Sequence, residues 1–84
     1  MKYTICIDRQ AAKTLTALPP NIQRQIARKI DSLANDPFPS GFVPIQGMAG
    51  LYRIKSGEYR IAYKVEGKKL IVLVIRVGHR KDFY

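Results

Sequence analysis

The residues of this chain best suited to chemistry are basic side chains between Leu51 and Tyr84, together with the final tyrosine itself. The basic set comprises Arg53, Lys55, Arg60, Arg76, His79, Arg80 and Lys81. A β-sheet needs none of these charges for its stability. A site that binds and cleaves a phosphodiester needs several cations around the phosphate. We therefore expect these side chains to form one site on a rigid sheet.

Three strands joined by tight turns are predicted to carry this site, with the sequences LYRIK, EYRIAYKV and LIVLVIRV. A two-residue turn at positions 56–57 would place Lys55 opposite Glu58 and Arg53 opposite Arg60. In that register the apolar side chains share one face of the sheet and the charges share the other. Two arginines that face each other across strands repel, so we expect an anion to lie between them.

The first half of the chain predicts a strand and a helical hairpin that support the sheet. Residues 2–9 alternate as a short strand does, and residues 11–18 have the spacing of an amphipathic helix. Pro19 and Pro20 separate this helix from a second one, whose apolar stripe is Ile22, Ile26, Ile30 and Leu33. A long ordered loop follows over residues 36–50. The order β-α-α-β-β-β predicts an α+β fold with the hairpin on one face of a small, mainly antiparallel sheet and the other face free for binding.

Length and charge set the class of protein. The chain of 84 residues is expected to form a single domain over residues 1–84. Lys and Arg number 15 against 6 Asp and Glu, which gives a net charge of +9. Such an excess on a small domain favours a polyanionic partner, with nucleic acid as the leading candidate. An acidic protein partner would explain the same charge.

Cysteine and hydropathy indicate the compartment. The lone Cys6 is expected to be a small buried hydrophobe in the first strand, and one thiol fits a reducing cytoplasm. No signal peptide is recognised, and the longest apolar run, residues 70–75, is too short to span a bilayer. We expect no membrane partner. One histidine and one cysteine do not supply a zinc site, so neither a metal nor a cofactor is expected.

The segment GMAGLYRIKSGEYRIAYKVEGKKLIVLVIRVGHRKDFY closely resembles the C-terminal half of RelE-type toxins of bacterial type II toxin–antitoxin pairs, in the RelE/ParE superfamily. The opening YTICIDRQAAKTLTALPPNIQRQIARKIDSL fits as well. The resemblance implies the RelE-like microbial RNase fold and a ribosome-dependent endoribonuclease that cuts mRNA in the ribosomal A site. It also implies an acidic, RelB-like antitoxin that wraps the toxin, and contact with operator DNA only through the antitoxin complex.

The same resemblance assigns roles to individual residues. The catalytic set it implies is Lys55, Arg60, His79, Arg80 and Tyr84. Arginines would clamp the phosphate while the 2′-hydroxyl of the RNA attacks it, a route that needs no metal. Lys55 and His79 are the candidates for base and acid, and Tyr84 would stack on a base or orient the hydroxyl. The RNA-binding set adds Arg53, Arg76, Lys81, Arg24, Arg28 and Lys29.

Two features leave alternatives open. Some relatives have lysine where this chain has Arg53, and a guanidinium is a poor proton acceptor. Arg76 alternatively forms an ion pair with Glu58 or Glu66.

The main rival function is a ParE-like toxin that inhibits DNA gyrase and does no chemistry of its own. A module that only binds nucleic acid or antitoxin is the third.

Overall fold

The computed structural model describes residues 2–83, without the side chains of Asp82 and Phe83. Tyr84, the predicted terminal member of the site, lies outside the described residues. The elements follow the chain in this order: β1 (Thr4–Ile7), α1 (Arg9–Thr16), α2 (Pro20–Ser32), β2 (Val43–Pro44), β3 (Leu51–Ser56), β4 (Tyr59–Glu66), β5 (Ile71–His79) and α3 (Arg80–Phe83).

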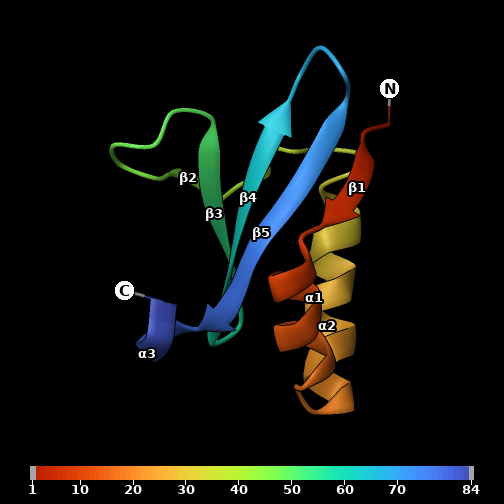
Figure 1. Cartoon of the computed structure of the whole chain (residues 1–84), viewed down its shortest axis with the longest axis vertical. Coiled ribbons are helices and arrows are strands. Elements are labelled where there is room, and N and C mark those ends of the chain that lie inside the picture. The colour runs from red at the N-terminus through yellow and green to blue at the C-terminus, as the bar shows by residue number, and fades with distance from the viewer. Residues whose placement is uncertain (1, 84) are drawn as a thin grey trace.

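The strands form one sheet in the spatial order β1-β5-β4-β3-β2. Only β1 and β5 are parallel, and the other neighbouring strands are antiparallel. The helices α1 and α2 run side by side as a layer on one side of the sheet (Figure 1). This arrangement confirms the predicted α+β fold, with the short β2 and the short terminal helix α3 as additions.

Local sequence explains the helical hairpin. The Asp8 side chain caps α1 by accepting a hydrogen bond of 3.1 Å from the backbone N–H of Gln10. Pro20 occupies the first turn of α2, where its missing N–H costs no hydrogen bond. Ile26 and Ile30 of α2 are buried against the sheet. None of the helices described here is long and apolar enough to cross a membrane.

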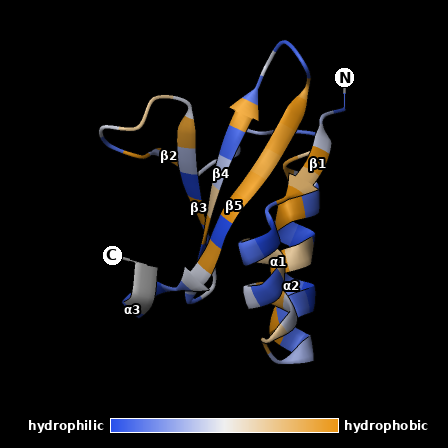
Figure 2. Cartoon of the chain, in the orientation of Figure 1, coloured by the Kyte–Doolittle hydropathy of each residue, from blue (hydrophilic) through white to orange (hydrophobic). Residues whose placement is uncertain are grey.

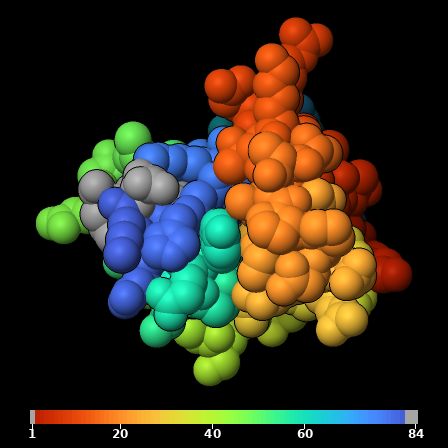
Figure 3. All heavy atoms as spheres, turned by 90° about the horizontal axis from the view of Figure 1, so that it is seen from below, coloured from red at the N-terminus to blue at the C-terminus, as the bar shows by residue number. Residues whose placement is uncertain are grey.

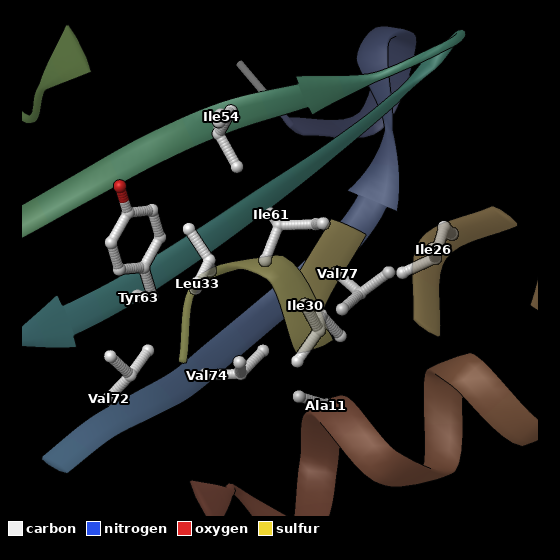
Figure 4. Close-up of a cluster of buried hydrophobic side chains, with 10 residues drawn as sticks. All are labelled: Ala11, Ile26, Ile30, Leu33, Ile54, Ile61, Tyr63, Val72, Val74 and Val77. Atoms are coloured by element: carbon white, nitrogen blue, oxygen red, sulfur yellow. The ribbon is translucent and has the colours of Figure 1, made fainter. Parts of the chain in front are cut away.

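The core lies between this helical layer and the sheet. Figure 4 shows side chains from α1 and α2 pointing toward side chains of β3, β4 and β5. The fully buried residues of this core include Ile26, Leu33, Ile61, Tyr63 and Val72. Most of β5 is hydrophobic along its length (Figure 2), as expected of a strand with neighbours on both sides. This core fixes which face of the sheet remains open.

A β-bulge in β5 sets the direction of the strand's last residues. Tyr63 pairs with Val74, but Ala62 pairs with Arg76, so Ile75 is the extra residue. Without it, strict alternation after the buried Val74 would point Arg76 into the core and Val77 out of it. With it, Val77 is 4% exposed and Arg76 is exposed. The bulge therefore places a charge on the open face and keeps the core apolar.

The prediction that Cys6 is buried is wrong, because the thiol is exposed. In the parallel pairing with β5, Ile5 lies beside the buried Val72 while Cys6 lies beside Leu73 on the opposite face. The strand β1 is at the edge of the sheet, and α1 and α2 lie against the face that bears Ile5.

Tyr63 links the sheet to the loop after α2, because its hydroxyl donates a 2.8 Å hydrogen bond to the Pro37 carbonyl. Burial, with smaller effects of Tyr52 and Asp36, raises the pKa of Tyr63 from 10.0 to about 12. The folded protein thus holds this proton more tightly than the unfolded chain does. The resulting stabilisation is complete below about pH 10 and is lost as pH rises through about 12.

We predict that Tyr63→Phe lowers the free energy of unfolding by about 1–2 kcal/mol, because the Pro37 carbonyl loses its partner. Urea denaturation measures this loss. The advantage of the wild type over Tyr63→Phe should shrink as the pH rises from about 10 to about 12. Tyr52→Phe is the matched control, since no hydrogen bond of that hydroxyl is found within residues 2–83, and should leave stability nearly unchanged. An equal loss in both variants would contradict the prediction.

Candidate functional site: a cationic open face

The face of the sheet away from α1 and α2 carries the predicted cations in two cross-strand rows. One row consists of Lys55 in β3, Arg60 in β4 and Gly78 in β5. The next row consists of Arg53, Ala62 and Arg76 from the same strands. Each row thus contains two basic side chains and one small residue. The small residues leave room beside the cations that a larger side chain would occupy.

This pairing corrects the predicted register. Lys55 faces Arg60 and Arg53 faces Ala62, because the turn lies at Gly57 and Glu58 rather than at positions 56–57. Gly57 has a φ of +61°, a conformation that glycine adopts without strain. A shift of two residues preserves the face of every side chain. The predicted division into an apolar and a charged face is therefore confirmed, although the predicted opposite pairs were wrong.

A hollow of about 240 Å³ opens among three of these cations. Its walls are Arg53, Lys55 and Arg60, completed by Gly41, Val43 and Ile54. No acidic residue is among these lining residues. Lys55 is exposed and Arg53 and Arg60 are half-buried, so these like charges repel each other with partial screening by solvent. A phosphate would relieve this repulsion and bind several donors at once.

Arg60 in β4 and Arg80 at the start of α3 approach the same turn. One terminal nitrogen of Arg60, Nη1, donates to the carbonyl oxygens of Tyr59 at 3.1 Å and of Gly57 at 3.4 Å. The backbone N–H of Arg80 donates to the Glu58 carbonyl at 2.8 Å. Figure 3 shows the β3–β4 turn beside the segment that follows β5. The structure thus brings Arg80 to the end of the sheet where Arg60 lies.

An ion pair also connects Arg80 to this turn. Its Nε lies 2.7 Å from Oε2 of Glu58, and both side chains are more than half exposed. Because the Glu58 carboxylate lies beside Nε, the two terminal nitrogens of the Arg80 guanidinium point away from Glu58. Because exposed pairs contribute little to stability, the main physical effect of Glu58 is to restrict the orientation of Arg80.

His79 lies apart from the cationic rows. It pairs with Tyr59, whose side chain faces the helices, and the two rings meet edge to face with centroids 5.3 Å apart. Its Nδ1 accepts a hydrogen bond of 3.2 Å from the backbone N–H of Lys81. The ring also lines a separate hollow of about 510 Å³ between α1 and β5. The bulge explains this placement, since it shifts the faces of all residues after Ile75.

The remaining predicted residues are spread more widely. Arg28 and Lys29 of α2 share a shallow hollow with Lys55, whereas the exposed Arg24 does not line it. Lys81 is exposed in α3. The acids suggested as partners of Arg76 hold other cations: Glu58 binds Arg80, and Glu66 lies 3.0 Å from Lys64.

Sequence reasoning missed three contributors to this face. Ala62 and Gly78 matter because they are small, and Glu58 matters because it binds Arg80. The alternation of the strands could have pointed to Ala62, since a lone small residue falls between two arginines once the register is known. The position of Glu58 in a tight turn gave no such signal.

Comparison with known proteins gives a consistent result. Residues 5–84 match a family described as the ParE toxin of type II toxin-antitoxin system, parDE. Toxin RelG of Mycobacterium tuberculosis is 29% identical over the whole chain and 98% of its own length. The mRNA interferase toxin RelE of Escherichia coli is 31% identical over 96% of this chain and 86% of its own. A chain in the crystal structure of the archaeal RelE–RelB complex from Pyrococcus horikoshii superposes with a TM-score of 0.85 at 28% identity, covering 98% of this chain and 99% of that one.

The fold, the cationic face and these matches define the class, a toxin of a type II toxin–antitoxin system. Within the RelE/ParE superfamily, the chain belongs to the RelE family of toxins. The resemblance seen in the sequence is confirmed.

We predict that Glu58→Ala frees the Arg80 side chain without unfolding the protein. The order parameter of its Nε–H bond, measured by ¹⁵N relaxation, should fall from a rigid value to below about 0.6. Stability should change by less than about 1 kcal/mol, because the ion pair is exposed. Glu58→Gln keeps an oxygen acceptor and should give an intermediate value. Arg24, exposed on α2, is the internal reference for a mobile arginine. If Arg80 in the wild type were as mobile as Arg24, the prediction would fail.

Proposed function

We propose that this chain is a ribosome-dependent endoribonuclease that cleaves mRNA in the ribosomal A site and thereby stops translation. The observation that carries the proposal is the pair of cationic rows around Ala62 and Gly78, which offers a phosphate several donors and space to lie. The related Escherichia coli RelE is named an mRNA interferase, which supports the same activity here.

The proposed reaction uses the 2′-hydroxyl of the RNA as its nucleophile. Its oxygen attacks the adjacent phosphorus while the bond to the 5′-oxygen of the next nucleotide breaks. The products are a 2′,3′-cyclic phosphate and a free 5′-hydroxyl. Arg60 and Arg80 clamp the non-bridging oxygens and stabilise the charge that grows on them in the transition state. Arg53 and Arg76 hold the neighbouring backbone through the adjacent row.

Proton transfer is assigned to Lys55 on the open face. Lys55 is the proposed base, because it lies directly opposite Arg60 and lines the cationic hollow. It takes the proton of the 2′-hydroxyl, and the leaving 5′-oxygen takes a proton from water. The predicted role of Tyr84 in stacking or orienting the substrate is kept as part of this proposal. His79 faces the helices, so we assign it to holding the start of α3 through the Lys81 N–H rather than to acid catalysis. Arg28, Lys29, Arg24 and Lys81 would contact ribosomal RNA or flanking message.

The proposed partners are the ribosome with its bound message and an acidic, RelB-like antitoxin that wraps the toxin in the cytoplasm. A similar chain was crystallised in a RelE–RelB complex, which supports such an antitoxin. Operator DNA would be contacted only through the antitoxin complex.

A gyrase inhibitor is the second candidate, because the family description names ParE. That function requires a protein-binding surface and no phosphate clamp. The grouping of Arg53, Lys55 and Arg60 around one hollow with no acidic lining residue favours the nuclease.

We predict that Arg80→Ala lowers the rate of message cleavage about 100- to 1000-fold, as loss of one transition-state donor typically does. Primer extension on ribosome-bound message after brief induction measures the cuts. Lys68→Ala, at the exposed β4–β5 turn, is the control and should cleave like the wild type. Cleaved DNA trapped on gyrase, with message left intact, would show the second candidate to be right.

A second prediction concerns neutralisation. The antitoxin should cover the face formed by Arg53, Lys55 and Arg60 or displace the Tyr84 tail, so its association rate should fall steeply with salt. Stopped-flow binding should show a slower rate for Lys55→Glu than for the control Lys13→Glu on α1. An antitoxin complex that still cleaved message at the wild-type rate would contradict this masking.

A further inference from the structure

A larger, mostly apolar hollow of about 560 Å³ adjoins the cationic one on the open face of the sheet. Two arginines interrupt its apolar walls, Arg53 and Arg76. Its apolar lining comes from β2 and the following loop, from β3, from β4 and from the bulge of β5: Val43, Pro44, Ile45, Met48, Leu51, Ala62 and Ile75.

The floor of this hollow follows from the register. Ala62 lies between Arg53 and Arg76 across the strands, and the bulged Ile75 lies beside Arg76. Val43 and Arg53 line both hollows. A ligand with its phosphate among Arg53, Lys55 and Arg60 would therefore extend directly into the apolar hollow.

The loop that supplies the outer wall is held in place by contacts outside the hollow. Phe38, Phe42 and Tyr52 pack ring against ring with centroids 5.1–5.7 Å apart, on the side of the sheet where Tyr52 packs against the core. The backbone N–H of Ile45 donates to the Leu51 carbonyl at 2.9 Å. This ordered loop nonetheless exposes Val43 by 42% and Met48 by 55%. The fold thus leaves large apolar side chains in water around a cavity, which costs free energy unless something binds there.

We infer that this hollow is a nucleobase subsite, which receives the base of a nucleotide adjoining the phosphate bound in the cationic hollow. The inference rests on the proposed function only in taking RNA as the ligand. A base has an apolar face for Ile75 and Met48, and its planar ring stacks well on guanidinium groups. In a nucleotide a single sugar separates the base from the phosphate. The two groups can therefore occupy two neighbouring hollows that share Val43 and Arg53 as a wall. The subsite would give the toxin a preference among bases at that position.

Methyl NMR on the full-length toxin tests the subsite without ribosomes or cleavage. Adenosine 3′-monophosphate should shift the methyl resonances of Met48 and Ile75, whereas ribose 5-phosphate and inorganic phosphate should leave them in place. The exposed Ile7 on β1 is the control for non-specific contact and should not shift with any probe. Equal shifts with ribose 5-phosphate, or no shift with the nucleotide, would overturn the inference.

Variants separate this subsite from the nuclease proposal. Met48→Ala and Ile75→Ala should each weaken nucleotide binding about 3- to 10-fold, a part of what one stacked base contributes. Inorganic phosphate should bind these variants as it binds the wild type, and Ile7→Ala should change neither affinity.

If cleavage occurs but its base preference is unchanged in Met48→Ala, the subsite is wrong and the nuclease stands. If the nucleotide binds as described but message is not cut, the nuclease is wrong and the subsite stands. Occupation of the hollow by an antitoxin peptide alone would also overturn it.

Discussion

The backbone pairing of β3, β4 and β5 is the constraint on which the rest of this molecule depends. Because paired residues share a face, the register alone decides that Lys55 and Arg60 stand together, and that Arg53 and Arg76 flank Ala62. The bulge at Ile75 is part of the same constraint. It allows one strand to give Val74 and Val77 to the core while giving Arg76 to the opposite face.

Stability and chemistry are divided between the two faces of the sheet. The face toward α1 and α2 is closed by isoleucine, leucine and valine, and the buried Tyr63 hydroxyl there donates a hydrogen bond to the Pro37 carbonyl. The other face holds cations whose mutual repulsion opposes folding. A small domain tolerates this because the repelling groups stay near solvent, where their interaction is screened.

The sequence was sufficient for the helices and for the faces of the strands, since these depend on local spacing. Pro20 and the stripe through Ile26 and Ile30 predicted α2 nearly to its bounds. The predicted opposite pairs in β3 and β4 were wrong. Turns at positions 56–57 and at 57–58 give pairings that differ by two residues, so both keep the same side chains on each face of the sheet, and the hydrophobic pattern does not distinguish them. Cys6 and His79 were misplaced for a different reason. Burial at a sheet edge and side-chain direction after a bulge depend on neighbours distant in sequence, which a periodic pattern does not contain.

The parallel pairing of β1 with β5 has a consequence for synthesis of the protein. The first strand of the chain finds its hydrogen-bonding partner only in residues 71–74, and Arg76 and Arg80 follow those residues. A nascent polypeptide lacking β5 has no partner for β1 and an incomplete set of cations. Closing so long a loop is slow compared with forming a helix. The open face of this protein is therefore completed only after β5 has been synthesised and has paired with the strand that was made first.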